Sequence, residues 1–173
     1  MTLFDALKTL LLLTVGAVLQ VTFVSYVEVS SGQPDLVLVL VVCVALLRGP
    51  MLGAVAGFWG GLVLDMATFE TLGLTSLLLT LAGYACGRLG QTLSKSSPHP
   101  PLIAVALATV GVALGSAFLH FVLGTTVSPA TLFGRMLLPA LALNLLLAWP
   151  LHRLCRKLFP ATARERREVS IAV

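Results

Sequence analysis

Charged residues are scarce in this chain of 173 residues. They make up 10% of the sequence, against 58% hydrophobic residues, and the mean hydropathy is +1.02. This composition excludes an ordinary soluble domain and is typical of an integral membrane protein. Long apolar stretches use almost all of the chain up to Cys155. We therefore expect a single transmembrane domain over residues 1–155, followed by a basic cytoplasmic tail over residues 156–173.

Signatures of catalysis and of metal binding are missing. The chain has no Gly-x-Ser-x-Gly turn, no His-Glu-x-x-His pair and no phosphate-binding glycine loop. Its three cysteines, Cys43, Cys86 and Cys155, lie in or at the end of apolar stretches, with no histidine at ligand spacing. No basic run is interleaved with aromatic residues, as nucleic-acid binding requires. We expect no enzyme activity, no cofactor, no metal and no nucleic-acid partner.

The few charges follow a topological pattern. We assign the polar breaks between the apolar stretches alternately to the two sides of a membrane. Ten of the 11 lysines and arginines then fall on the same side. The other side carries Glu28, Asp35, Asp65 and Glu70, with Arg135 as its cation. Because loops rich in lysine and arginine stay cytoplasmic, the pattern predicts six spans with both termini in the cytoplasm.

The apolar stretches predict helices over about 3–27, 35–47, 51–64, 72–89, 102–123 and 132–155. The second and third are short, because 14 helical residues reach only ~21 Å against a hydrocarbon core of ~30 Å. We interpret them as a tight cytoplasmic hairpin that turns at Arg48-Gly49-Pro50. A single uninterrupted helix would place Arg48 in the middle of the bilayer. Whether both helices cross fully is left open.

Glycines recur at helical spacing in three of these stretches. Gly53, Gly57 and Gly61 are four residues apart and share one face of the third helix. Similar pairs occur in the fourth and fifth helices. In lipid, helices associate by close packing, and glycine lets two backbones approach each other. Internal packing of the bundle is the first interpretation, and docking of another membrane protein is the alternative.

Several polar residues are candidates for a site. Asp35 and Asp65 mark the outer ends of the hairpin, so we expect them to be neighbours and one of them to pair with Arg135, because a charge at the membrane edge is costly without a partner. The group is either an outer pocket or docking patch, or a clamp that fixes orientation. Asn144 lies in the middle of the sixth stretch and is expected to bond another helix, with ligand contact as the alternative. Arg48 opens the cytoplasmic turn of the hairpin and Arg88 lies at the cytoplasmic end of the fourth stretch, and both are candidates for docking or packing.

Short motifs follow one another between residues 34 and 89. They are Pro34-Asp35-Leu36, Arg48-Gly49-Pro50, Gly53, Gly57-Phe58, Gly61-Leu62, Asp65, Leu72-Gly73-Leu74, Gly83-Tyr84 and Gly87-Arg88-Leu89. This ordered set resembles the rod shape-determining protein MreD family, and so do the chain length, the six spans and the cytoplasmic termini. The resemblance covers about a third of the chain in motifs, and the rest agrees in hydropathy.

The resemblance implies an all-α six-helix bundle similar in fold to the substrate-binding subunits of energy-coupling-factor vitamin transporters. It also implies a non-catalytic scaffold of the bacterial elongation machinery in the inner membrane. The implied partners are an MreC-like bitopic membrane protein and, directly or indirectly, MreB-like, RodA-like and class B penicillin-binding proteins, with membrane lipid around them. Asp35, Asp65 and the face of Gly53, Gly57 and Gly61 are then candidates for MreC docking.

The alternative function is a vitamin-type substrate-binding subunit of a membrane transporter. A solute site could use Asp35, Asp65, Asn144 and His120. Short outer loops with few aromatic residues count against it.

Overall fold

The computed structural model describes residues 3–23, 34–69, 72–92, 100–124 and 137–159. Within these ranges the chain forms helices and no strand, which confirms the all-α expectation. The helices are α1 (Leu3–Phe23), α2 (Leu36–Arg48), α3 (Pro50–Thr68), α4 (Leu74–Thr92), α5 (Pro100–Val122) and α7 (Leu138–Leu158).

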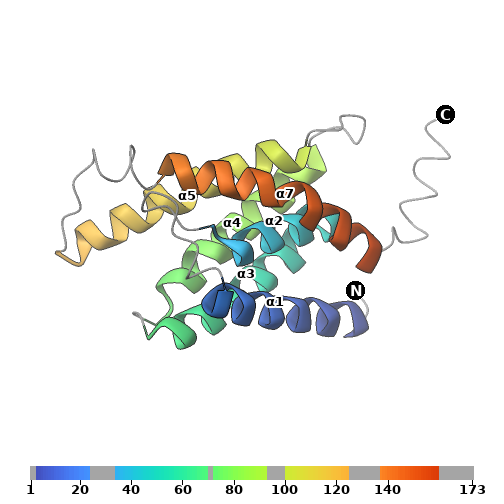
Figure 1. Cartoon of the computed structure of the whole chain (residues 1–173), viewed down its shortest axis with the longest axis horizontal. Coiled ribbons are helices and arrows are strands. Elements are labelled where there is room, and N and C mark those ends of the chain that lie inside the picture. The colour runs from blue at the N-terminus through green and yellow to red at the C-terminus, as the bar shows by residue number, and fades with distance from the viewer. Residues whose placement is uncertain (1–2, 24–33, 70–71, 93–99, 125–136, 160–173) are drawn as a thin grey trace.

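Helix α2 forms the centre of the bundle. Residues 37–45 of this helix are each at most 2% exposed. A helix that is hydrophobic on every side has no face suited to water, so it can be buried completely by lipid or by other helices. Helices α1, α3, α4, α5 and α7 all pack against α2, and α1 and α7 lie on opposite sides of it in Figure 1. The short second stretch of the sequence is therefore the core of the protein.

The turn between α2 and α3 occurs at Arg48-Gly49-Pro50, where the sequence predicts it. The amide of Gly49 donates to the carbonyl of Ala45 (2.8 Å), and the carbonyl of Gly49 accepts from the amide of Gly53 (3.0 Å). Gly49 has a φ of 90°, in the left-handed region where a side chain is strained. Pro50 opens α3 at a position whose amide has no intrahelical partner.

One expected boundary is wrong. Helix α3 was expected to end near Leu64, before an outer loop that begins at Asp65, but it continues to Thr68. Asp65 is only 1% exposed and lies inside the helix. The reason is that its carboxylate bonds the start of α4 instead of water. The ends expected at Val27 and Leu132 for the first and last spans lie outside the described residues.

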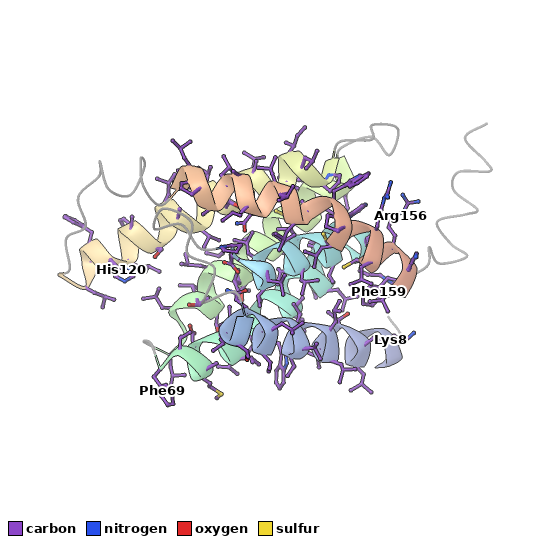
Figure 2. All side chains as sticks on the ribbon, in the orientation of Figure 1. Lys8, Phe69, His120, Arg156 and Phe159 are labelled. Atoms are coloured by element: carbon purple, nitrogen blue, oxygen red, sulfur yellow. The ribbon has the colours of Figure 1, made fainter. Side chains whose placement is uncertain are left out.

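The two ends of the bundle differ in the basic side chains that they carry. The start of α1 and the end of α7 lie at the same end in Figure 1. Lys8, Arg156 and Phe159 lie at this end in Figure 2, whereas Phe69 and His120 lie at the opposite end. The guanidinium of Arg48 lies 5.3 Å from the ring centroid of Phe159 and so belongs to the first group. We call the end of the bundle that carries Lys8, Arg48, Arg156 and Phe159 the basic end.

Three of the described helices, α3, α5 and α7, are long and apolar enough to cross a membrane. The apolar parts of α1 and α2 are shorter, spanning Ala6–Thr22 and Leu36–Arg48. The six full crossings therefore stay a prediction, while the apolar helices agree with a membrane protein.

Candidate functional site

The glycine face of α3 is in contact with α4. A Cβ atom added to Gly53 would lie 2.5 Å from the carbonyl oxygen of Gly83. Added to Gly57 or Gly61, it would overlap backbone atoms of Leu79 or Ser76. The two backbones therefore touch directly, as close helix packing in lipid requires. These three glycines lie inside the bundle, and a docking partner could not reach them without separating α3 from α4.

Polar side chains from α1 and α7 converge on the first turn of α2, together with that of its own cap residue, Asp35. The first amides of a helix have no partner within it, and those of α2 begin inside the bundle, away from water. The carboxylate of Asp35 accepts from the amide of Leu38 (3.0 Å). The side-chain oxygen of Gln20, on α1, accepts from the amide of Val37 (2.8 Å). The side-chain oxygen of Asn144, on α7, accepts from the amide of Asp35 (2.8 Å).

The same network extends to α5. The amide nitrogen of Asn144 donates to the hydroxyl of Thr109 (3.1 Å), which in turn donates to the carbonyl of Val105 (2.9 Å). Asn144 is 1% exposed and Thr109 is 6% exposed. We refer to Gln20, Asp35, Thr109 and Asn144 as the α2 cap cluster. It joins α1, α2, α5 and α7, and the hydrogen bonds compensate for burying these polar groups.

Asp35 and Asn144 were singled out from the sequence, and the structure brings them together. Gln20 and Thr109 were not recognised as their partners. An amide within an apolar helix was a usable signal for Gln20, because such side chains usually bond a neighbouring helix. No signal was available for Thr109, since a threonine hydroxyl can always bond the preceding turn of its own helix.

Asp65 performs a similar task at the start of α4. Its Oδ2 accepts from the amide of Gly73 (2.8 Å), and from the amide and the hydroxyl of Ser76 (both 3.4 Å). The carboxylate therefore caps the first turn of the following helix. Its second oxygen, Oδ1, is buried without a hydrogen-bond partner in the structure.

The two aspartates thus cap different helices, and among the described hydrogen bonds none joins them. Arg135, their expected partner, lies outside the described residues, so that ion pair stays a prediction. His120 approaches the carbonyl of Ser116 with its Nδ1 (2.8 Å), one turn back in its own helix. It lies at the end of the bundle marked by Phe69 (Figure 2).

At the basic end, arginines stack on aromatic rings. The guanidinium of Arg153 lies 3.9 Å from the ring centroid of Trp149, in addition to the contact between Arg48 and Phe159. Arg88, on α4, is exposed. Within the described ranges, no group of three or more His, Cys, Asp or Glu side chains could hold a metal ion.

Taken together, the apolar helices and the internally bonded polar groups define a helical membrane protein whose polar side chains hold its own helices in place. The family model of the rod shape-determining protein MreD matches residues 2–161. Because this match covers nearly the whole chain, the protein belongs to the MreD family. No curated protein and no solved structure matches the chain.

Proposed function

We propose that this protein is a non-catalytic scaffold of the elongation machinery in the bacterial inner membrane, and that it binds an MreC-like bitopic protein. Membership of the MreD family gives it a role in rod-shape determination. Binding of the bitopic protein, and through it control of peptidoglycan synthesis with MreB-like, RodA-like and class B penicillin-binding proteins, is the proposal. The observation that carries it is the α2 cap cluster, because its side chains bond the first amides of α2 and, between Asn144 and Thr109, each other, instead of facing a solute.

The exposed face of α5 is the surface we propose for the partner's single transmembrane helix. Gly111 is exposed on this face, and a Cβ added to it would meet nothing within 4 Å. The neighbouring exposed side chains on the same face are bulky, namely Leu107, Leu114 and Phe118. A glycine between large side chains forms a notch into which another helix can pack closely. Asp35 and the α3 glycines, the earlier docking candidates, are engaged inside the bundle and support docking less well.

Co-purification with the bitopic partner tests this surface. We expect Gly111→Leu, which fills the notch, to reduce recovery of the partner at least tenfold while thermal unfolding stays near that of the wild type. Ala142→Leu is the matched control, because Ala142 is also small and exposed but lies on α7. Equal recovery with Gly111→Leu and Ala142→Leu would move the docking surface elsewhere. The scaffold proposal itself would be refuted if the wild type failed to retain the partner, or if a vitamin clearly raised its unfolding temperature.

We propose further that the basic end faces the cytoplasm and that both termini lie there. The shared location of Lys8 and Arg156 supports this orientation, since cations concentrate on the cytoplasmic side. Reporter fusions after residues 96 and 173 should be active only as cytoplasmic reporters. Fusions after residues 30 and 128 should be active only as extracytoplasmic ones. A periplasmic signal at residue 96 would contradict the orientation.

A further inference from the structure

The exposed surface of α7 changes character along its length. One face carries exposed residues three or four positions apart: Leu138, Ala142, Leu146, Trp149, Arg153 and Arg156. The first three are apolar, the fourth is aromatic and the last two are cationic. We call this face the α7 stripe. The order of these side chains along the helix matches the layers of one bilayer leaflet, which run from hydrocarbon through the interface to the headgroups.

Distances along the helix agree with that match. At 1.5 Å per residue, Leu138 and Trp149 are ~17 Å apart, close to the ~15 Å that one leaflet contributes to the ~30 Å hydrocarbon core. Arg156 lies another ~10 Å along the helix, beyond the hydrocarbon core. Trp149 is 61% exposed, and the guanidinium of Arg153 lies 3.9 Å from its ring centroid. Arg153 is thereby held at the depth of an interfacial tryptophan. A phospholipid phosphate occupies this depth, whereas an acidic protein in the cytoplasm would first meet charges further from the membrane.

The two arginines are spaced to share one phosphate. Residues three apart in a helix have Cβ atoms ~5–6 Å apart, and two guanidinium groups can then donate to the same phosphate oxygens. The carboxylates of Asp35 and Asp65 are both bonded to helix caps inside the bundle and do not neutralise this pair. Helix α4 provides a natural comparison. Its exposed residues Leu77, Leu81 and Tyr84 lead to Arg88 in the same order, but among the described residues this face has one cation where the α7 stripe has two.

From this arrangement we propose that Arg153 and Arg156, with Trp149 beneath Arg153, form a binding site for the headgroup phosphate of an anionic phospholipid. Stacking on the indole restricts the guanidinium of Arg153 before the lipid arrives, which lowers the entropy lost on binding. The bound lipid would hold the last turns of α7, and with them the basic end, at a defined depth in the membrane. This site is separate from the proposed partner surface on α5.

Titration of the full chain in detergent with phosphatidylglycerol, followed by thermal unfolding, tests the site. Phosphatidylcholine serves as the neutral lipid, and soluble glycerol phosphate as the phosphate without a lipid. We expect phosphatidylglycerol alone to raise the unfolding temperature. Removing a cation near a membrane surface weakens binding roughly fivefold, so Arg153→Gln and Arg156→Gln should each weaken it by that factor and the double variant by roughly 25-fold.

Arg88→Gln is the matched control and should leave the affinity for phosphatidylglycerol within about twofold of the wild type, since the described part of its face has no second cation to share the phosphate. The double variant Arg153→Lys/Arg156→Lys keeps the charge and should keep part of the affinity, which covers the case in which the glutamine variants unfold. Equal losses with Arg88→Gln and Arg153→Gln would mean a diffuse charge effect and overturn the site. Equal stabilisation by phosphatidylcholine or by glycerol phosphate, or displacement of the lipid by poly-glutamate, would overturn it too.

Discussion

Substitution of Gly57 by alanine isolates the contact between the backbones of α3 and α4. A single methyl group is added, but its carbon would overlap the carbonyl group of Leu79 and the amide nitrogen of Thr80. These are backbone atoms of a neighbouring helix, so no side-chain rotation can make room. The two helices must move apart along an interface where Gly53 and Gly83 are packed just as closely.

The expected magnitude follows from that overlap. Forcing one extra carbon into a packed core costs about 1–3 kcal/mol, and the rigid neighbour places Gly57→Ala at the upper end of that range. Gly111→Ala adds the same methyl group where nothing lies within 4 Å. There the only large effect is the better helix propensity of alanine, worth about 0.5–1 kcal/mol in favour of the folded state. The two variants should therefore differ by about 3 kcal/mol in the free energy of unfolding.

Unfolding in mixed detergent micelles, followed by circular dichroism as the denaturing detergent is increased, measures this difference. The expected order of stability is Gly57→Ala below the wild type, with Gly111→Ala equal to the wild type or above it. A second variant, Gly53→Ala, should resemble Gly57→Ala because its methyl group would meet the carbonyl of Gly83. If Gly57→Ala and Gly111→Ala unfold alike, direct backbone contact between α3 and α4 is refuted.

Substitutions at three further positions probe the caps and the turn. Asn144→Leu should destabilise the fold by about 1–3 kcal/mol in the same assay, because the backbone amide of Asp35 loses its acceptor inside the bundle. A loss below about 0.5 kcal/mol, roughly the contribution of one weak hydrogen bond, would count against the α2 cap cluster. Asp65→Ala should lower the free energy of unfolding by about 1 kcal/mol, and Asp65→Asn by less, since asparagine keeps an oxygen that can accept from the amides of Gly73 and Ser76. Equal losses of stability in the two variants would contradict the capping role of Asp65. Gly49→Ala should cost about 1 kcal/mol through its positive φ alone, measured against Gly111→Ala.

The α3–α4 interface illustrates how far periodicity reaches. The four-residue spacing of Gly53, Gly57 and Gly61 was enough to predict a close-packing face, because helical geometry puts such residues in one row. It could not identify the neighbour, since a glycine has no side chain that favours one helix over another. The end of α3 was misplaced for a related reason. An aspartate after an apolar run is typical of a loop, and only the position of α4 shows that Asp65 can be satisfied while buried.

The sequence alone determined that the chain is a membrane protein, that its fold is all-helical and that it turns at Gly49. Hydropathy, helical period and the conformational freedom of glycine are local properties, which is why the sequence suffices for these three. It also marked Asp35 and Asn144 as polar groups in need of partners. The tertiary structure decided which groups became those partners, and that α2, the shortest of the described helices, is the centre of the bundle. The physical reason is that many different side chains could satisfy a buried polar group equally well, and only the packing of helices distant in sequence selects the partner.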